Sequence, residues 1–171
     1  MRRTKEDAEK TRHAILAAAE QLFLERGVAH TSLEQIARHA GVTRGAVYWH
    51  FQNKAHLFHE MLNQVRLPLE PLAQQLAAVD GLSSLQLLRD LCIEAMANLV
   101  LDEQRRRILT VLLRRCEFTE ELREAEERHE TFVNQFIDLC EQQFALPAVQ
   151  PYLQPGITPR LASRTLHALL V

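Results

Sequence analysis

Apolar residues recur at helical spacing along nearly the whole length of the chain. The first such stretch runs from about residue 7 to residue 26 and spaces its apolar side chains three and four positions apart, on one face of a helix: Ile15, Ala18, Ala19 and Leu22. The 171 residues include only 5 glycines and 6 prolines, too few for many short strands joined by turns. The spacing therefore predicts an all-α protein with long helices.

Helix-start signals mark the later helices. N-caps are predicted at Asn53, at Ser83 or Ser84 and at Thr158, another helix is predicted to begin at Asp102, and residues 119–122 are predicted to open a long helix that reaches about Phe144. Pro68 and Pro71 are expected to bend or break the helix that begins after Asn53, because proline lacks the amide hydrogen that a helix interior needs.

Two short helices are predicted in the first third of the chain, joined by a turn that contains Gly41. The run Thr31-Ser32-Leu33-Glu34 has the pattern of a capping box with Thr31 as its N-cap, and Gly41 supplies the left-handed residue that ends this helix. Thr43 caps the second helix, in which Val47 and Phe51 face inward. Two helices joined in this way form a helix-turn-helix.

The outward side of the second short helix carries side chains that suit DNA. Arg44 can bond guanine O6 and N7 together, Gly45 lets the backbone approach a groove closely, and Tyr48 offers its ring to a thymine methyl group. The remaining predicted contacts, to phosphates or base edges, are Thr31, Ser32, Thr43, Trp49, His50 and Lys54. The alternative is that the aromatic residues only close a small helical core. The capped helix-turn-helix favours DNA.

The net charge of −2 conceals an asymmetry along the chain. Residues 1–54 hold nine Lys or Arg and six Asp or Glu, whereas residues 55–171 hold eleven and sixteen. Arg2, Arg3 and Lys5 form a basic N-terminal arm that would add nonspecific affinity for nucleic acid. A basic module on an acidic body agrees with the DNA hypothesis.

The run GVTRGAVYWHFQNK, residues 41–54, resembles the signature of the TetR family of bacterial repressors. Other stretches resemble this family or its multidrug-efflux branch: residues 2–6, 18–23, 26–28, 31–37, 106–108 and 116–119. The resemblance implies a helical repressor that pairs through its last two helices into a homodimer and binds a palindromic operator in double-stranded DNA. It also implies control of a multidrug efflux pump and release from DNA when a ligand binds.

The resemblance thus divides the chain into a DNA-binding domain, residues 1–54, and a ligand-binding and dimerisation domain, residues 55–171. The expected ligand is a hydrophobic, drug-like small molecule, because the helix stripes of the body are rich in soft, bulky side chains. The candidate wall residues are Leu62, Val65, Leu69, Cys92, Met96, Leu99, Leu109, Leu113, His129, Val133, Phe136 and His167. The two histidines would supply polar contacts. For each apolar residue, plain core packing is the alternative.

Other classes of protein find little support. No stretch approaches the ~18 apolar residues of a membrane span, no signal peptide is present, and we expect a cytoplasmic protein without cofactor. His56 and His59 resemble part of a zinc motif, but Asn63 stands where its second histidine is needed. Residues 105–107 are three arginines, interpreted as a charged helix face. Lacking a nucleophile–base pair, the chain is predicted not to be an enzyme. A protein-binding helical adaptor remains an alternative.

The cysteines and the last residues of the chain lead to two further expectations. Cys92, Cys116 and Cys140 are far apart within helical patterns, which predicts reduced, buried thiols. The sequence stops at Val171 inside an apolar run, so the last helices are expected to be incomplete. A molecule that ended there would be expected to dimerise poorly, as a truncated, non-repressing variant.

Overall fold

The computed structural model describes residues 5–66, 68–79, 81–117 and 119–170. Throughout these residues the regular structure is helical, which confirms the predicted all-α class. The chain divides into two compact units, residues 1–66 with 102–129 and residues 67–101 with 130–171. In the described part of the chain, no helix is both long enough and apolar enough to cross a membrane.

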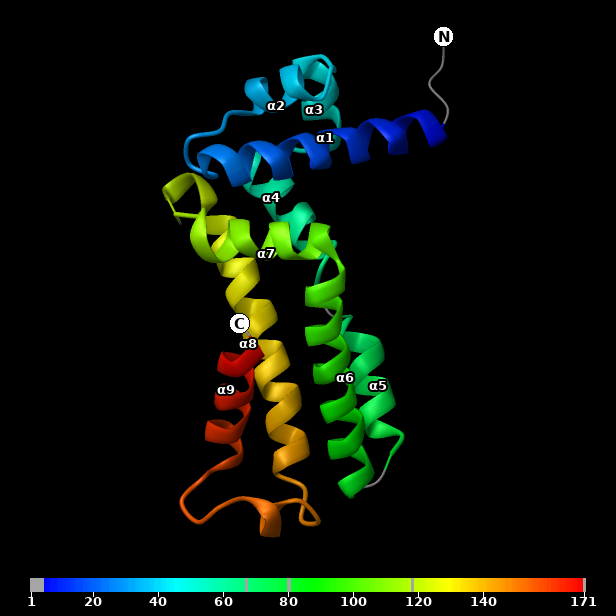
Figure 1. The fold of residues 1–171 in the computed structure, drawn as a ribbon, viewed down its shortest axis with the longest axis vertical. Coiled ribbons are helices and arrows are strands. Elements are labelled where there is room, and N and C mark those ends of the chain that lie inside the picture. Colours follow the sequence, from blue (N-terminus) through cyan, green and yellow to red (C-terminus); the bar gives the residue numbers. More distant parts are fainter. Residues whose placement is uncertain (1–4, 67, 80, 118, 171) are drawn as a thin grey trace. The chain divides into compact units, whose positions relative to one another are not determined.

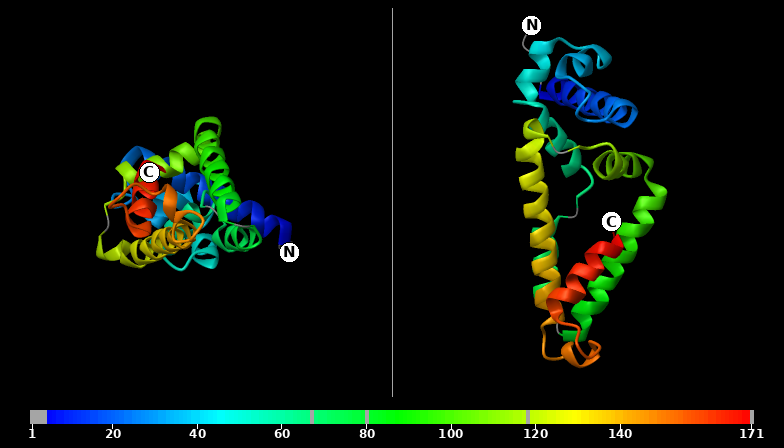
Figure 2. Two further views of the ribbon diagram at one scale, coloured as in Figure 1. Left: turned by 90° about the horizontal axis from the view of Figure 1, so that it is seen from below. Right: turned by 90° about the vertical axis from the view of Figure 1, so that its left-hand side faces the viewer.

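The first unit contains the predicted helix-turn-helix (Figure 1). Its elements are α1 (Lys5–Arg26), α2 (Leu33–His39), α3 (Arg44–His50), α4 (Lys54–Asn63), α7 (Glu103–Arg114), the short 3-10 helix η1 (Glu120–Leu122) and the start of α8 (Arg123–Phe144). Helix α1 lies between the α2–α3 pair and α7 (Figures 1 and 2). One core joins them, because the buried Phe23, Phe58, Ile108 and Leu122 come from α1, α4, α7 and η1. The helix-turn-helix therefore shares its core with residues 102–129.

The second unit contains α5 (Leu69–Ala77), α6 (Gly81–Leu101), the remainder of α8, the 3-10 helix η2 (Gln150–Tyr152) and α9 (Pro159–Leu170). Its core is made by α5, α6 and α8 through Leu72, Leu76, Leu88, Phe136, Leu139 and Cys140. Helix α9 runs beside α8 (Figure 2), where Arg160 pairs with Asp138 and, at 2.9 Å, with Glu141.

The predicted helix starts are confirmed at three positions outside the helix-turn-helix. The side chains of Asn53, Asp102 and Thr158 each accept a hydrogen bond from the amide three residues later. The helix after Asn53 ends before Pro68 as predicted, but Pro71 lies in the first turn of α5, where its missing amide hydrogen costs nothing.

The cap predicted at Ser83 or Ser84 is wrong. Helix α6 already begins at Gly81, so Ser83 and Ser84 lie inside its first turn, where the Ser84 hydroxyl donates to the Gly81 carbonyl at 2.7 Å. The helix predicted to open at residues 119–122 begins there as the short 3-10 helix η1, which α8 follows directly as far as Phe144, and Thr119 makes no side-chain cap.

Candidate nucleic-acid interface

The turn between α2 and α3 is built from local hydrogen bonds. Gly41 adopts a left-handed φ of 67°, which lets the chain reverse direction after α2. Thr43 then caps α3 as predicted, its hydroxyl accepting from the Ala46 amide at 3.1 Å. Val47 and Phe51, expected to face inward, are 0% and 1% exposed. Capped at one end and anchored by apolar side chains, this seven-residue helix holds a defined orientation.

The face of α3 opposite Val47 is open to solvent. Thr43, Arg44 and Gly45 are exposed, Tyr48 is 46% exposed and Trp49 is 73% exposed. An indole that is three-quarters exposed on a short helix contributes little to the core, so its position favours a contact outside the molecule. This arrangement presents the predicted DNA-reading side chains together.

Arg44 and Tyr48 interact across one turn of α3. The Arg44 guanidinium donates to the Tyr48 hydroxyl at 3.3 Å and lies 5.4 Å from the centre of its ring. This hydrogen bond raises the pKa of Arg44. The pair thus holds a planar donor at the exposed start of the helix, where two parallel N–H groups can meet a guanine edge.

His50 is half-buried at the end of α3. Its ring lies edge-on to the Trp49 indole, with 4.5 Å between the ring centroids, and 6.1 Å from the Phe51 ring. These contacts orient the exposed indole. His50 therefore supports Trp49 in addition to any contact of its own with a phosphate.

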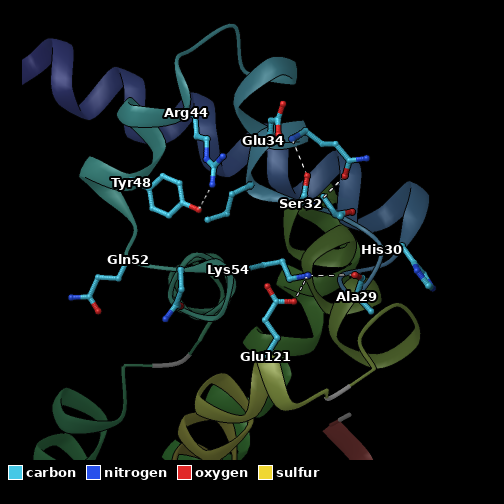
Figure 3. Close-up of a pocket in the computed structure, with 13 residues that line it drawn as sticks. Ala29, His30, Ser32, Glu34, Arg44, Tyr48, Gln52, Lys54 and Glu121 are labelled. Atoms are coloured by element: carbon cyan, nitrogen blue, oxygen red, sulfur yellow. Dashed lines mark hydrogen bonds and ion pairs between the residues drawn. The ribbon is translucent and has the colours of Figure 1, made fainter.

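A groove of about 770 Å³ opens beside this face (Figure 3). Its wall comes from the start of α2, from α3, from the turn before α4 and from η1. The residues that line it are Ala29, His30, Thr31, Ser32, Leu33, Glu34, Gln35, Arg44, Tyr48, Gln52, Asn53, Lys54 and Glu121. Much of this wall is polar, which distinguishes it from an apolar ligand cavity.

The structure corrects the prediction for Thr31. Its side chain is 1% exposed, and its hydroxyl donates to the Gly27 carbonyl at 2.8 Å. The N-cap of α2 is Ser32, one residue later, whose side chain accepts from the Gln35 amide while Gln35 bonds back to the Ser32 amide. Ser32 is exposed in the groove, whereas Thr31 stabilises the loop and offers nothing to a phosphate.

Lys54 also differs from its prediction. This residue is only 4% exposed, and its ammonium group lies 2.8 Å from the Glu121 carboxylate and 3.4 Å from the Ala29 carbonyl oxygen (Figure 3). It is therefore not free to clamp a phosphate in this structure. Sequence reasoning missed Glu121 entirely, because nothing local to residue 54 indicates a partner so far along the chain.

Part of the predicted basic arm, Arg2 and Arg3, lies outside the described residues, as does Val171. Lys5 is exposed at the first turn of α1. Of the predicted charged helix face, Arg105 pairs with Asp102, and Arg107 pairs with both Glu103 and the buried Glu20 of α1. Among the described residues, no group of three or more His, Cys, Asp or Glu side chains could hold a metal ion.

The candidate ligand residues fall into both units. Leu62, Val65, Leu109, Leu113 and His129 belong to the first, and Leu69, Cys92, Met96, Leu99, Val133, Phe136 and His167 to the second. In the first unit, Leu62 is part of the core, and His129 Nδ1 accepts a hydrogen bond from the Arg66 guanidinium at 3.4 Å. In the second, the rings of Phe136 and His167 are 6.2 Å apart.

The second unit also contains an apolar groove of about 440 Å³. It is lined by Leu85, Gln86, Leu88, Arg89, Cys92, Ile93, Phe144 and Leu166, of which sequence reasoning named only Cys92.

Burial raises the pKa of the Cys92 thiol and raises that of Cys140 to about 12. All three cysteines are free; Cys140 is buried and the others are half-buried.

Two family models match the chain. One, described as "Bacterial regulatory proteins, tetR family", matches residues 15–61, and the other, described as "MAATS-type transcriptional repressor, C-terminal region", matches residues 83–169. The first covers the helix-turn-helix and most of α4. The second covers over half of the chain.

Individual relatives agree with these models. The probable HTH-type transcriptional regulator ArpR of Pseudomonas putida is 44% identical over 133 residues, which are 78% of this chain and 63% of ArpR. The solved structure of NalD, the secondary repressor of the MexAB-OprM multidrug efflux pump in Pseudomonas aeruginosa, is 66% identical with a TM-score of 0.89. That match covers 96% of this chain and 81% of NalD.

A complex of SmeT with triclosan is also similar, with 33% identity and a TM-score of 0.73 over 94% of this chain and 77% of SmeT. A second structure describes SmeT as the repressor of the Stenotrophomonas maltophilia multidrug efflux pump SmeDEF. The chain spans less than two thirds of the length of curated relatives such as ArpR. The matches to both families and the shared fold show that this chain belongs to the TetR family, whose members are transcriptional regulators and not enzymes.

Proposed function

We propose that this protein is a ligand-responsive transcriptional repressor of a multidrug efflux pump. In this proposal residues 1–54 bind a palindromic operator in double-stranded DNA, and residues 55–171 bind a ligand and take part in forming a homodimer. Two heads would then enter successive major grooves about one helical turn apart. Because the operator lies on the bacterial chromosome, the protein would act in the cytoplasm.

The exposed face of α3 is the observation that carries the DNA proposal. Arg44, Tyr48 and Trp49 lie on the open side of the capped helix α3. There the two aromatic rings leave apolar surface exposed to water and contribute little to packing. NalD and SmeT, both similar over more than nine tenths of this chain, are described as repressors of multidrug pumps, which supports the same function here.

The ligand part of the proposal is supported by the apolar groove in the second unit and by the triclosan complex of SmeT. We propose that a hydrophobic, drug-like molecule binds this body and weakens DNA binding. Triclosan is a suitable first probe. It should raise the melting temperature of the protein, since a ligand that binds only the folded state stabilises it.

The DNA proposal is tested by Arg44→Ala. Duplexes that the wild-type protein binds are first selected from a random pool, and affinities are then measured by gel shift on a selected and a scrambled duplex. Loss of one bidentate base contact is worth about 1–3 kcal/mol, so Arg44→Ala should bind the selected duplex roughly ten-fold or more weakly.

Arg38→Ala is the matched control, because Arg38 is an exposed arginine of α2 that pairs with Glu34 at 3.6 Å. It removes the same charge without touching α3. If Arg44→Ala and Arg38→Ala bind the selected duplex equally well, Arg44 does not read DNA.

A further inference from the structure

The ion pair between Lys54 and Glu121 occupies the groove beside α3 (Figure 3). Lys54 is the first residue of α4, and its ammonium group lies 2.8 Å from the Glu121 carboxylate and 3.4 Å from the Ala29 carbonyl oxygen. Only the first carries a charge. Glu121 therefore neutralises the one lysine that lines the groove.

Contacts of the neighbouring residues hold Glu121 in this position. The next residue, Leu122, is 0% exposed in the core of the first unit, and η1 packs against α4. Earlier in the same segment, the Arg115 carbonyl accepts from the Val28 amide at 3.0 Å. Arg115 is thus attached to the loop after α1, and η1 is attached to α4.

The two partners differ in their freedom to move. The Lys54 side chain is 4% exposed and held within the groove wall, whereas the Glu121 side chain is 58% exposed. A carboxylate on an exposed side chain can rotate away into water at small cost, because water solvates it well. Breaking the pair therefore requires motion of Glu121 and leaves the buried Lys54 as an uncompensated cation, which is costly unless another anion, such as a phosphate in the groove, takes the place of Glu121.

We propose that Glu121 competes with a DNA phosphate for Lys54 and so lowers the affinity of the head for DNA. This inference rests on the proposed DNA-binding function. A phosphate beside Lys54 would lie close to the Glu121 carboxylate, and two anions at such a distance repel each other. DNA must therefore displace Glu121 before Lys54 can contribute a phosphate contact.

The competition couples DNA binding to the position of η1. A change that draws η1 away from α4 removes the competitor and strengthens DNA binding, and a change that holds it in place weakens DNA binding. By linkage, bound DNA must favour the arrangement in which Glu121 has left Lys54. Residue 121 thereby sets the affinity of a site to which it contributes no contact of its own.

The test compares Glu121→Gln with Glu120→Gln on the selected and scrambled duplexes over a range of salt concentrations. Glu120 is the matched control, since its side chain is exposed and pairs with Arg123 at 3.2 Å. Both variants remove one negative charge. Glu121→Gln should bind both duplexes about three- to ten-fold more tightly, and its dependence of log K on log salt should steepen by about 0.9 for each head, as one added phosphate contact predicts.

Two further variants make the result specific. Glu121→Asp keeps the charge but shortens the side chain, so a gain in affinity here excludes a simple effect of net charge. In a Lys54→Gln background, Glu121→Gln should give no more gain than Glu120→Gln. Circular dichroism melting shows that each variant is folded at the temperature of the binding assay.

The outcomes separate the two proposals. If the wild-type protein binds no duplex, the proposed function fails, and this inference fails with it. Suppose that the wild-type protein binds DNA but that Glu121→Gln gains no more affinity than Glu120→Gln, or gains as much affinity in the Lys54→Gln background as in the wild type. Then Glu121 does not compete for Lys54, and the inference alone is overturned.

Discussion

Replacing Gly45 with alanine should stabilise the protein and weaken its binding to DNA. Gly45 is the second residue of α3 and is exposed to solvent. A Cβ atom placed on it meets only the Thr43 hydroxyl oxygen, at 3.9 Å, which is ordinary van der Waals contact. The new methyl group therefore needs no rearrangement of the fold.

The two expected effects have opposite signs. Alanine in place of glycine stabilises a helix by about 0.5–1 kcal/mol, which corresponds to a rise of roughly 1–4 °C in Tm for a chain of this length. The same methyl group projects from the surface that is proposed to approach the major groove. Moving the backbone away disturbs the bidentate contact of the neighbouring Arg44, so affinity for the selected duplex should fall by about ten-fold.

The assay measures thermal melting by circular dichroism and affinity by gel shift on the same protein samples. Gly45→Leu extends the series, because leucine is also a good helix former but is larger, and its loss of affinity should exceed that of Gly45→Ala. If Tm rises while affinity for the selected duplex is unchanged or improved in both variants, the backbone at Gly45 does not approach the groove.

Two predictions concern the stability of the first unit. Arg107→Met should lower the free energy of unfolding by about 2 kcal/mol, because the 6% exposed Glu20 side chain loses its guanidinium partner; the loss stays below the full cost of breaking a buried pair because Arg107 is 41% exposed. In urea unfolding, the control Arg114→Met, at an exposed arginine, should change this free energy by less than about 0.5 kcal/mol. Equal effects of the two substitutions would contradict the argument. Burial, and then the nearby Arg66 and Arg128, lower the pKa of His59 from its ordinary value of 6.5, so the folded state resists protonation and stability should be full above about pH 6.5 and fall as the pH drops below it. Between pH 7 and 5, His59→Gln should lose less stability than the wild-type protein. The control His30→Gln, which changes an exposed histidine, should lose as much as the wild-type protein.

The helix-turn-helix could be predicted because its signals are local. A left-handed glycine, an N-cap at Thr43 and two apolar residues four apart specify α3 within eleven residues of sequence, from Gly41 to Phe51, and the structure agrees at each point. The N-cap of α2 is Ser32, whereas the sequence pattern predicted Thr31. Thr31 and Ser32 both suit an N-cap, and burial of the Thr31 hydroxyl against the Gly27 and Leu22 carbonyls decides between them.

Partners distant in sequence could not be predicted. The periodicity of α7 identifies its apolar face but does not indicate that this face packs on α1, or that Arg107 meets Glu20. For the same reason Lys54 resembled a free cation. In the second unit, helical spacing identified inward faces, yet it could not indicate that Phe144 and Leu166 line the same groove as Cys92.

These long-range contacts bear on how DNA affinity is controlled. Arg107, Arg115 and Glu121, all within residues 102–129, contact the first third of the chain through an ion pair with Glu20, a backbone hydrogen bond with Val28 and an ion pair with Lys54. Each of the three involves a buried or backbone group and is costly to break, but in the third a DNA phosphate can replace Glu121 as the partner of the buried Lys54 ammonium. A perturbation of this segment should therefore act first at Glu121, altering the charge available to DNA while the core of the first unit remains intact.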